Sequence, residues 1–424
     1  MEKLIETLNE TFGKTFEINH ISKVEIDSRK IGKDDVFIAI NNGKNYIQEV
    51  LDKGASLVIC DDSHWKNNNK VIVVEDSIKA MQLLAKNYRQ KLNTKIIGIT
   101  GSEGKTTTKD IIHGVLSSKY KAKKTLGNYN NHIGLPFTIL QLKEDDEFGV
   151  IEMGMSHKGE IPILCEIAGI DYGVITNIGD SHLEFMINRD NVFEEKSQIK
   201  NYIPKENLFI FGDDVYLSKL LGNKIGFNSE NNFIINNYTE TSEGVKFSLN
   251  NENYLFKLNG KHNCINASIA ISLGLSLGLS KEEIQTGLDS VQVTPMRFEK
   301  IVKNGIFYIN DAYNASPVSM KASLETFNNI KFDNKKLAII ADMGEMGADE
   351  IKYHKDVIDF ALTTEIDNFI LLGERMKKAL ENFNDERLIF CNSKEEIKEL
   401  INKKYKDNII LLKGSNFNHL WEII

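Results

Sequence analysis

The strongest constraint on the fold is a strand, a glycine loop and a helix start that follow one another near residue 100. An apolar, β-branched run at 96–99 leads into the loop GSEGKTT at 101–107. Glycines let backbone N–H groups turn toward an anion, and the N-terminus of a helix adds a favourable dipole. Lys105 can reach the β- and γ-phosphates of a nucleotide, and the Thr106 hydroxyl can ligate Mg²⁺. We therefore expect seven loop residues to bind ATP: Gly101, Ser102, Glu103, Gly104, Lys105, Thr106 and Thr107.

The loop departs from the common eight-residue phosphate loop, because Ile99 stands where the first glycine of that loop would be. The alternative interpretation is a tight glycine turn with an incidental lysine. The glycines, the lysine, the threonine and the preceding strand all agree on a phosphate site instead. The shorter form, GxxGKTT, is typical of one set of ATP-dependent ligases.

Length and charge limit the remaining possibilities. A chain of 424 residues is too long for one ordinary core, so two or three domains are expected. With a net charge of -8, nothing in the composition indicates the basic face that nucleic-acid binding needs, so no nucleic-acid partner is expected. The four cysteines are widely scattered and have no zinc spacing. No segment has the length of a signal core or a membrane span. We expect a monomeric cytoplasmic protein that is not inserted into a membrane.

Three blocks are expected along the chain, at 1–92, 93–298 and 299–424. The first contains strand candidates DVFIAI, SLVIC and VIVVED and a helix at 77–92. The second alternates apolar strands with helices, which predicts a doubly wound parallel sheet around the phosphate loop. Residues 232–258 alternate apolar and polar side chains, which predicts an antiparallel β extension.

The third block has five strand candidates separated by helices, which predicts a small Rossmann-like sheet: IFYIND, KLAIIADM, NFILLG, RLIFC and NIILLKGS. It has no GxGxxG after its first strand, so dinucleotide binding is not expected there. The predicted fold class is therefore α/β, with three domains.

Ligands of doubly wound sheets bind at the carboxyl ends of the strands, so the residues that follow each strand are candidates. Glu152 follows FGVI and suits Mg²⁺, although a solvated loop glutamate is the alternative. His182 follows GVITNIG and is a candidate ligand for a second metal ion, although most lone histidines are structural.

Two further segments carry polar side chains in unusual density. Asn128, Asn130 and Asn131 lie in TLGNYNNHIGLP, where amide groups suit a peptide or sugar substrate, and an Asn-rich turn is the alternative. In the third block, Asp311 can accept hydrogen bonds from a ribose. The other nucleotide candidates are Tyr313 and Asn314 for the adenine, and Arg297, at the expected hinge, for phosphate or ribose.

Taken together, ordered motifs along nearly the whole chain resemble the bacterial Mur ligases. The segment at 127–136 most resembles the members that add D-alanyl-D-alanine to UDP-N-acetylmuramoyl-tripeptide. Besides the phosphate loop and 127–136, the matching segments are 27–29, 152–161, 176–184, 194–199, 260–270, 295–299, 309–317, 341–347 and 411–415.

The resemblance implies an N-terminal domain for the UDP end, a central ATPase domain, and a C-terminal domain for nucleotide and amine. It implies that the peptide carboxylate attacks ATP to form an acyl phosphate, which the amine of D-alanyl-D-alanine then attacks, in peptidoglycan precursor synthesis. The implied cofactors are ATP and two Mg²⁺ ions.

Several residue roles come from the resemblance alone. Lys196 is similar to a carbamylated lysine whose carbamate binds metal, and it joins Lys105 and His182 as a catalytic candidate. Asn266 matches a nucleotide-side segment. Ser28 and Arg29 match the motif near the UDP-sugar. With Lys196, the implied metal ligands are Thr106, Glu152 and His182.

Two segments depart from the family pattern. Asn416 stands where the family usually has arginine, which affects the expected contact to the amine substrate. Residues 42–46 stand where the family usually has a Phe-Asp-Gly-His string. This difference affects the expected binding of the UDP-sugar. Two alternatives stay open: a sibling ligase with another amino acid or acceptor, and a non-catalytic nucleotide-binding paralogue.

Overall fold

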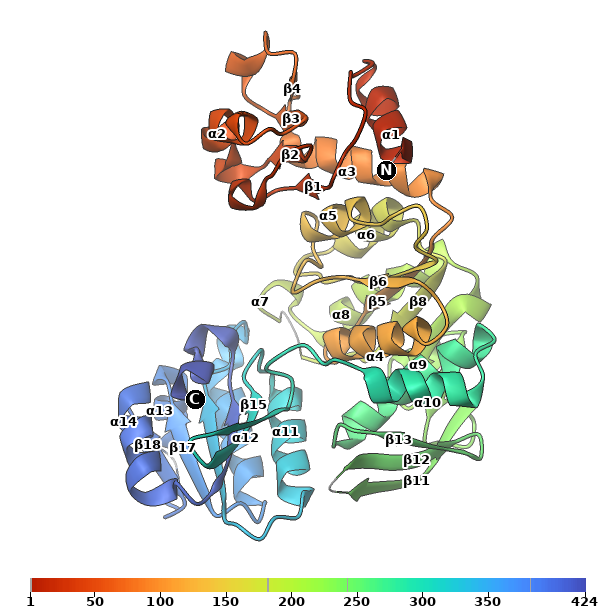
Figure 1. Cartoon of the computed structure of the whole chain (residues 1–424). Helices are drawn as coiled ribbons and strands as arrows, with labels where there is room; N and C mark the ends of the chain where they lie inside the picture. Colours follow the sequence, from red (N-terminus) through yellow and green to blue (C-terminus); the bar gives the residue numbers. More distant parts are fainter. Residues whose placement is uncertain (1, 181–182, 242, 382) are drawn as a thin grey trace. The chain divides into compact units, whose positions relative to one another are not determined.

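The computed structural model describes residues 2–180, 183–241, 243–381 and 383–424 (Figure 1). It contains two compact units, which we name unit 1 and unit 2. Unit 1 comprises Met1–Thr100, Lys119–Val174 and Ser197–Leu208. Unit 2 comprises Gly101–Ser118, Ile175–Lys196 and Phe209–Ile424. Among the described residues, no helix has the length and apolar character needed to cross a membrane.

A small parallel sheet with strand order β1-β2-β3-β4 forms the N-terminal part of unit 1. Its strands are β1 (Val24–Glu25), β2 (Val36–Ala39), β3 (Leu57–Cys60) and β4 (Val71–Val73). The helices of this part are α1 (Glu2–Phe12), α2 (Ile47–Asp52) and α3 (Ser77–Lys91). The three predicted strands and the predicted helix are confirmed. The Asp76 side chain fixes the start of α3, because it accepts hydrogen bonds from two N–H groups of the first turn.

Unit 1 also contains four strands in the order β8-β5-β7-β6. They are β5 (Lys95–Thr100), β6 (Ala122–Lys124), β7 (Phe148–Glu152) and β8 (Tyr172–Ile175), with helices α5 (Gly134–Leu140) and α6 (Glu160–Ala168). β7 pairs in parallel with both β5 and β6. β7 is buried along its whole length, and β5 is buried after its first residue. Burial on both faces explains why these strands are nearly continuous apolar runs.

Unit 2 begins with the glycine loop and α4 (Lys105–Ser117). Five strands in this unit have the order β13-β12-β11-β10-β9. They are β9 (Leu208–Phe211), β10 (Asn223–Gly226), β11 (Phe233–Thr241), β12 (Gly244–Leu249) and β13 (Glu252–Phe256). β11, β12 and β13 pair antiparallel, which confirms the predicted β extension. The accompanying helices are α7 (Leu183–Met186), α8 (Arg189–Lys196), α9 (Lys261–Ser276) and α10 (Lys281–Ser290).

The C-terminal part of unit 2 is built on a sheet with strand order β14-β15-β19-β16-β17-β18. The strands are β14 (Glu299–Lys303), β15 (Ile306–Asp311), β16 (Lys336–Ala341), β17 (Asn368–Leu372), β18 (Leu388–Cys391) and β19 (Ile409–Lys413). The helices are α11 (Pro317–Asn329), α12 (Glu350–Leu362), α13 (Glu374–Leu380) and α14 (Lys394–Leu400). Only β14 among these strands pairs antiparallel. The five predicted strands are confirmed, and β14 is an edge strand that sequence reasoning missed.

Two apolar cores cover the faces of this C-terminal sheet. One core contains Met320, Leu324, Val357 and other side chains of α11, α12 and α13. The other contains Ile397 of α14 and side chains near the C-terminus. Helices on both faces of a mostly parallel sheet confirm the predicted Rossmann-like architecture and the α/β fold class. The carboxyl ends of β15, β16 and β19 therefore lie along one edge of the sheet.

Candidate active site

Two glycines give the phosphate loop its shape. Gly101 has φ +145°, and a Cβ atom there would lie 1.9 Å from Thr176 Oγ1. Gly104 has φ +78° and is the residue immediately before α4, where a Cβ atom would lie 2.9 Å from Asn266 Oδ1. Both backbone conformations disfavour other residues, and neither position has room for a side chain. The loop therefore needs these glycines for geometry as well as for access to an anion.

Hydrogen bonds to the segment after β8 hold the loop in place. The Glu103 N–H donates to Asn177 Oδ1 at 2.9 Å, and the Glu103 carbonyl accepts from Thr176 Oγ1 at 2.5 Å. The Gly179 N–H donates to Ser102 Oγ at 2.8 Å. The loop backbone is preorganised, so little ordering is required when an anion binds.

The cationic side chain of Lys105 folds back over the loop. Its Nζ donates to the carbonyl oxygens of Gly101 at 2.8 Å and Ser102 at 3.0 Å. A lysine ammonium has three donors, so it can exchange carbonyl oxygens for phosphate oxygens with a small change of side-chain torsions. Lys105 is thus held beside the position that the loop prepares for phosphate.

Arg297 links the phosphate loop to the C-terminal part of unit 2. Its guanidinium lies 4.2 Å from the centroid of the Tyr313 ring, and its Nη2 donates to Thr106 Oγ1 at 3.3 Å. The Nε atom of Arg297 is buried and has no hydrogen-bond partner among the described residues. Met296 and Phe298 have φ +62° and +57°, so strained left-handed backbone brackets the arginine. These features suit the hinge predicted at this position.

An ion pair links the carboxyl ends of two neighbouring strands, β15 and β19. Lys413, at the end of β19, lies 2.9 Å from Asp311, at the end of β15, and its Nζ also donates to the Asn314 carbonyl at 2.8 Å. The second carboxylate oxygen of Asp311 accepts from the Phe298 N–H at 3.1 Å. Burial lowers the pKa of the nearby His262, while the charge of Asp311 opposes that shift. The ring is therefore neutral near pH 7.

Two cavities meet at the phosphate loop, and Glu103 lines both. The first cavity, of about 120 Å³, is lined by Gly104, Thr107, Asn266, Arg297 and Asp311, together with Asn177, His262 and Lys413. We name it the nucleotide cavity because the first five of these residues are the ones predicted to bind ATP. The second cavity, of about 460 Å³, contains the predicted residues Ser102, Lys105 and Asn314, together with Asp180, Ser316, the segment 344–346, Ser415, Asn416, Phe417 and His419. Unit 2 thus brings most of the predicted ATP-binding residues together.

Glu103, which lines both cavities, is bound to Ser316, which lines the second cavity. The Glu103 carboxylate accepts from Ser316 Oγ at 2.7 Å. Ser316 also caps α11, because its side chain accepts from the Ser319 N–H. The Glu103 carboxylate is therefore linked to the N-terminal cap of α11.

Lys196 is a fully buried lysine at the end of α8. Burial lowers the pKa of its amine well below the ordinary value, and the neighbouring charge of Lys105 lowers it further. The charges of Glu103 and Glu195 oppose this shift. An uncharged amine is nucleophilic, so Lys196 has the chemistry that carbamate formation requires. His182, another predicted metal ligand, lies outside the described residues.

In unit 1, one predicted residue of the Asn-rich segment, Asn130, contacts the end of β7. Asn130 Nδ2 donates to Glu152 Oε1 at 2.8 Å, and the Glu152 N–H donates to Thr125 Oγ1 at 3.0 Å. Asn131 Oδ1 accepts from the N–H groups of residues 133 and 134 and fixes the start of α5. The Asn128 carbonyl accepts from the Asn130 N–H at 2.7 Å. The amide of Asn130 orients the Glu152 carboxylate.

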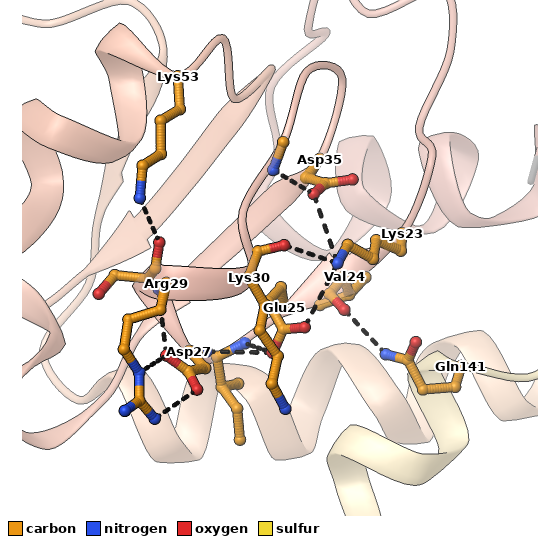
Figure 2. A network of polar contacts seen from close by, with 12 residues as sticks. Lys23, Val24, Glu25, Asp27, Arg29, Lys30, Asp35, Lys53 and Gln141 are labelled. Carbon is orange, nitrogen blue, oxygen red and sulfur yellow. Dashed lines mark hydrogen bonds and ion pairs between the residues drawn. The ribbon is translucent and has the colours of Figure 1, made fainter.

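Figure 2 shows the polar network around the predicted pair Ser28 and Arg29. The Arg29 guanidinium makes two hydrogen bonds of 2.8 Å to the carboxylate of Asp27, and its side chain is 86% exposed. This contact lowers the pKa of Asp27. Lys53 Nζ donates to the Ser28 carbonyl at 3.0 Å, and Gln141 Nε2 donates to the Val24 carbonyl at 2.9 Å. The backbone at 24–29 is held while the arginine stays accessible to solvent.

Sequence reasoning missed Asn177, Lys413 and Ser316 as site residues. Asn177 follows the strand YGVIT, and Lys413 ends the strand NIILLK, so both stand at carboxyl ends where ligands bind. That signal was available in the sequence. Ser316 is recognisable only as a helix cap, and its contact with Glu103 joins residues 213 positions apart.

Comparison with known proteins identifies two domain families in the chain. Residues 99–274 match the Mur ligase middle domain, and residues 296–416 match the domain described as Mur ligase, glutamate ligase domain. The UDP-N-acetylmuramoyl-tripeptide–D-alanyl-D-alanine ligase of Bacillus subtilis (strain 168) is 36% identical, over 96% of this chain and 93% of its own length.

Two crystal structures show the same fold. MurF from Acinetobacter baumannii has a TM-score of 0.87 and 25% identity, with 99% of this chain and 97% of that chain covered. MurF ligase from Thermotoga maritima in complex with ADP has a TM-score of 0.83 and 25% identity, with 95% of this chain and 96% of that chain covered.

Proposed function

We propose that this chain, which belongs to the Mur ligase family, joins D-alanyl-D-alanine to the peptide carboxylate of UDP-N-acetylmuramoyl-tripeptide at the expense of ATP. The observation that carries the proposal is the position of Lys105, in a preorganised phosphate loop at the wall of a second, larger cavity. A phosphoryl group bound at this loop would face the space where an acyl group and an amine can meet. The reaction would serve peptidoglycan synthesis in the cytoplasm.

ATP is assigned to the nucleotide cavity and the loop. The N–H groups of 101–107 and the ammonium of Lys105 would bind the phosphates. Asp311 would accept from the ribose, with Asn266, Tyr313 and Asn314 close to the nucleoside. Arg297 supports this assignment, because its buried and unpaired Nε leaves a donor for a ligand oxygen.

The reaction would proceed in two displacements. A carboxylate oxygen of the acceptor attacks the γ-phosphorus of ATP in line, ADP leaves, and an acyl phosphate forms. The amine then attacks the acyl carbon, loses a proton, and expels inorganic phosphate from the tetrahedral intermediate. Lys105 neutralises charge that develops on the transferred phosphoryl group. The acyl phosphate hydrolyses readily, so the second cavity must exclude water while the amine attacks.

The Lys196 amine would add to carbon dioxide, form a C–N bond and lose a proton, which produces an anionic carbamate. The carbamate and the Thr106 hydroxyl are ligand types that Mg²⁺ prefers, and the ion would supply positive charge at the phosphoryl oxygens. Glu152 and His182 remain predicted ligands on the basis of sequence position. Mass spectrometry of the native protein tests the carbamate, and short carboxylic acids should partly rescue Lys196→Ala. Failure of rescue, with an unmodified Lys196 in wild type, would contradict this step.

The acceptor contacts are assigned to unit 1. We infer that Ser28 and Arg29 bind the UDP-sugar. Asn128, Asn130 and Asn131 would bind the sugar or the peptide of the same substrate. The domain boundaries are proposed at 92/93 and 298/299. The accessible guanidinium of Arg29 supports a phosphate contact. Asn416 lines the second cavity in place of an arginine, so the carboxylate of the amine substrate would be bound there by amide and backbone donors.

The decisive experiment measures phosphate release from ATP by the full chain with a panel of UDP-muramoyl peptides and amines. The expected result is release that requires both UDP-N-acetylmuramoyl-tripeptide and D-alanyl-D-alanine. Release with another amine or acceptor would identify a sibling ligase. ADP binding without release under any combination would identify a non-catalytic nucleotide-binding protein. Either outcome would overturn the proposed function.

A further inference from the structure

One wall of the second cavity is a strained loop that follows β16. Gly344, Glu345 and Met346 line the cavity, and Glu345 has φ +60°. A residue other than glycine persists in this left-handed conformation only when its surroundings fix it. The contacts that hold 342–346 therefore determine the shape of the wall.

The middle of this loop is held by a buried histidine on α12. The Met343 N–H donates to His354 Nε2 at 2.9 Å, and His354 Nδ1 lies 2.6 Å from the Glu350 carbonyl oxygen. A carbonyl oxygen only accepts, so Nδ1 carries the proton and Nε2 offers its lone pair to Met343. The Met343 N–H thus requires the neutral form of this ring, and the Glu350 carbonyl fixes its tautomer. The side chain of His354 has no solvent exposure.

Different contacts fix the two ends of the loop. The Asp342 carboxylate accepts from the N–H groups of Arg375 at 3.2 Å and Met376 at 2.9 Å, in the first turn of α13. The Gly344 N–H donates to Ser415 Oγ at 3.0 Å. Met343 lies between these anchors, and its N–H is the backbone donor that His354 holds two residues before Glu345.

We propose that His354 is a positioning residue for the amine substrate, because it holds Met343 and thereby the cavity wall at 344–346 in the shape that receives D-alanyl-D-alanine. This inference rests on the proposed function of the second cavity. His354 itself does not line that cavity, and it acts through the loop.

Protonation would break this contact, since an imidazolium has no lone pair to accept the Met343 N–H. Burial lowers the pKa of His354 below its ordinary value of 6.5, and the charge of Arg375 acts in the same direction. Asp342, whose Oδ1 lies 4.0 Å from Nε2, and the Glu350 carbonyl and charge oppose the shift. On α11, the other helix packed against α12, Lys321 lies over the Phe360 ring instead.

The direction of the pH effect follows from the lowered pKa. The ring is neutral at pH 7, so the wall is intact there. As the pH falls below the ordinary histidine value and through the lowered pKa, the ring gains a proton, the bond is lost, and the KM for the amine rises. The amine substrate also titrates, but equally for every variant, so the ratio of KM values between variants isolates the effect of His354.

The test compares wild type, His354→Gln and His354→Leu between pH 5.5 and 8, with saturating ATP and UDP-N-acetylmuramoyl-tripeptide. Gln offers an acceptor oxygen that does not titrate, whereas Leu removes the acceptor at similar volume. Loss of the hydrogen bond should raise the KM for D-alanyl-D-alanine about five- to twentyfold in the Leu variant. The KM for ATP should stay within about twofold, because the loop 344–346 lines the second cavity and not the nucleotide cavity. The Gln variant should lose the acid rise of the amine KM.

An acid rise that persists in His354→Gln, or an equal increase of all KM values in His354→Leu, would overturn the proposal. Nitrogen NMR of histidine-labelled wild type gives a test that needs no turnover and no folded variant. Nε2 of His354 should be unprotonated at pH 7.5, and a protonated Nε2 would refute the positioning role. Absence of ligation by wild type, with an unprotonated Nε2, would instead contradict the proposed function.

Discussion

The stack of Arg297 on Tyr313 makes a quantitative prediction about nucleotide affinity. The guanidinium lies 4.2 Å from the ring centroid, and the same side chain reaches Thr106 in the phosphate loop. Tyr313→Ala removes the ring, whereas Tyr313→Phe retains its π face. A cation–π contact that is partly desolvated contributes about 1–2 kcal/mol. If ATP binding uses Arg297 in this orientation, the Ala variant should bind ADP about five- to thirtyfold more weakly.

Isothermal titration of ADP into the full chain measures this affinity, and a cycle with Arg297→Lys isolates the pair. Tyr313→Phe should bind within about twofold of wild type, because the ring face is unchanged. Adding Tyr313→Ala to Arg297→Lys should cost little more, since the stacked guanidinium is already lost. Strictly additive losses would refute the coupling. An equal loss in the Phe and Ala variants would show that the tyrosine hydroxyl matters instead, as an adenine contact would require.

Three further substitutions test the loop and its support. Lys105→Ala should abolish ATP-dependent ligation while thermal unfolding stays close to that of wild type, and normal turnover would defeat the phosphate-site assignment. Gly101→Ala would place Cβ 1.9 Å from Thr176 Oγ1, so ADP binding measured by calorimetry should be lost, and unchanged affinity would contradict the loop geometry. Asp110 accepts from Thr294 N–H and Oγ1 at 2.8 and 2.7 Å. Asp110→Ala should lower the free energy of unfolding in urea by about 2–4 kcal/mol, and Asp110→Asn by less; equal losses would refute the role of the retained oxygen.

Much of the fold could be predicted because it depends on local pattern. The strand at 95–100 was recognisable from β-branched side chains that the sheet buries, and α3 from its helical spacing of apolar residues. The antiparallel extension was recognisable because residues 232–258 alternate apolar and polar side chains and contain turn signals. β14 was missed, since its sequence EKIVK is short and largely exposed, as is usual for an edge strand.

Some site residues could be predicted from their position in the sequence, and others only from the family resemblance. Asp311 and Asn314 could be selected because they follow a strand, and the structure does bring both of them to the two cavities. By pattern alone Lys196 was a surface lysine, and its importance came only from family resemblance. Its burial, and hence its lowered pKa, depends on how α8 packs within unit 2.

The sequence by itself determined the phosphate loop, because a strand, two glycines with special backbone torsions and a helix start are properties of one short segment. It also determined the family, through motifs in a fixed order. Only the tertiary structure decided which partners these residues have. Lys413 meets Asp311, Arg297 meets Tyr313 and Thr106, and His354 meets Met343. Such contacts depend on chain topology and on burial, which change hydrogen-bond partners and pKa values without leaving a periodic signal in the sequence.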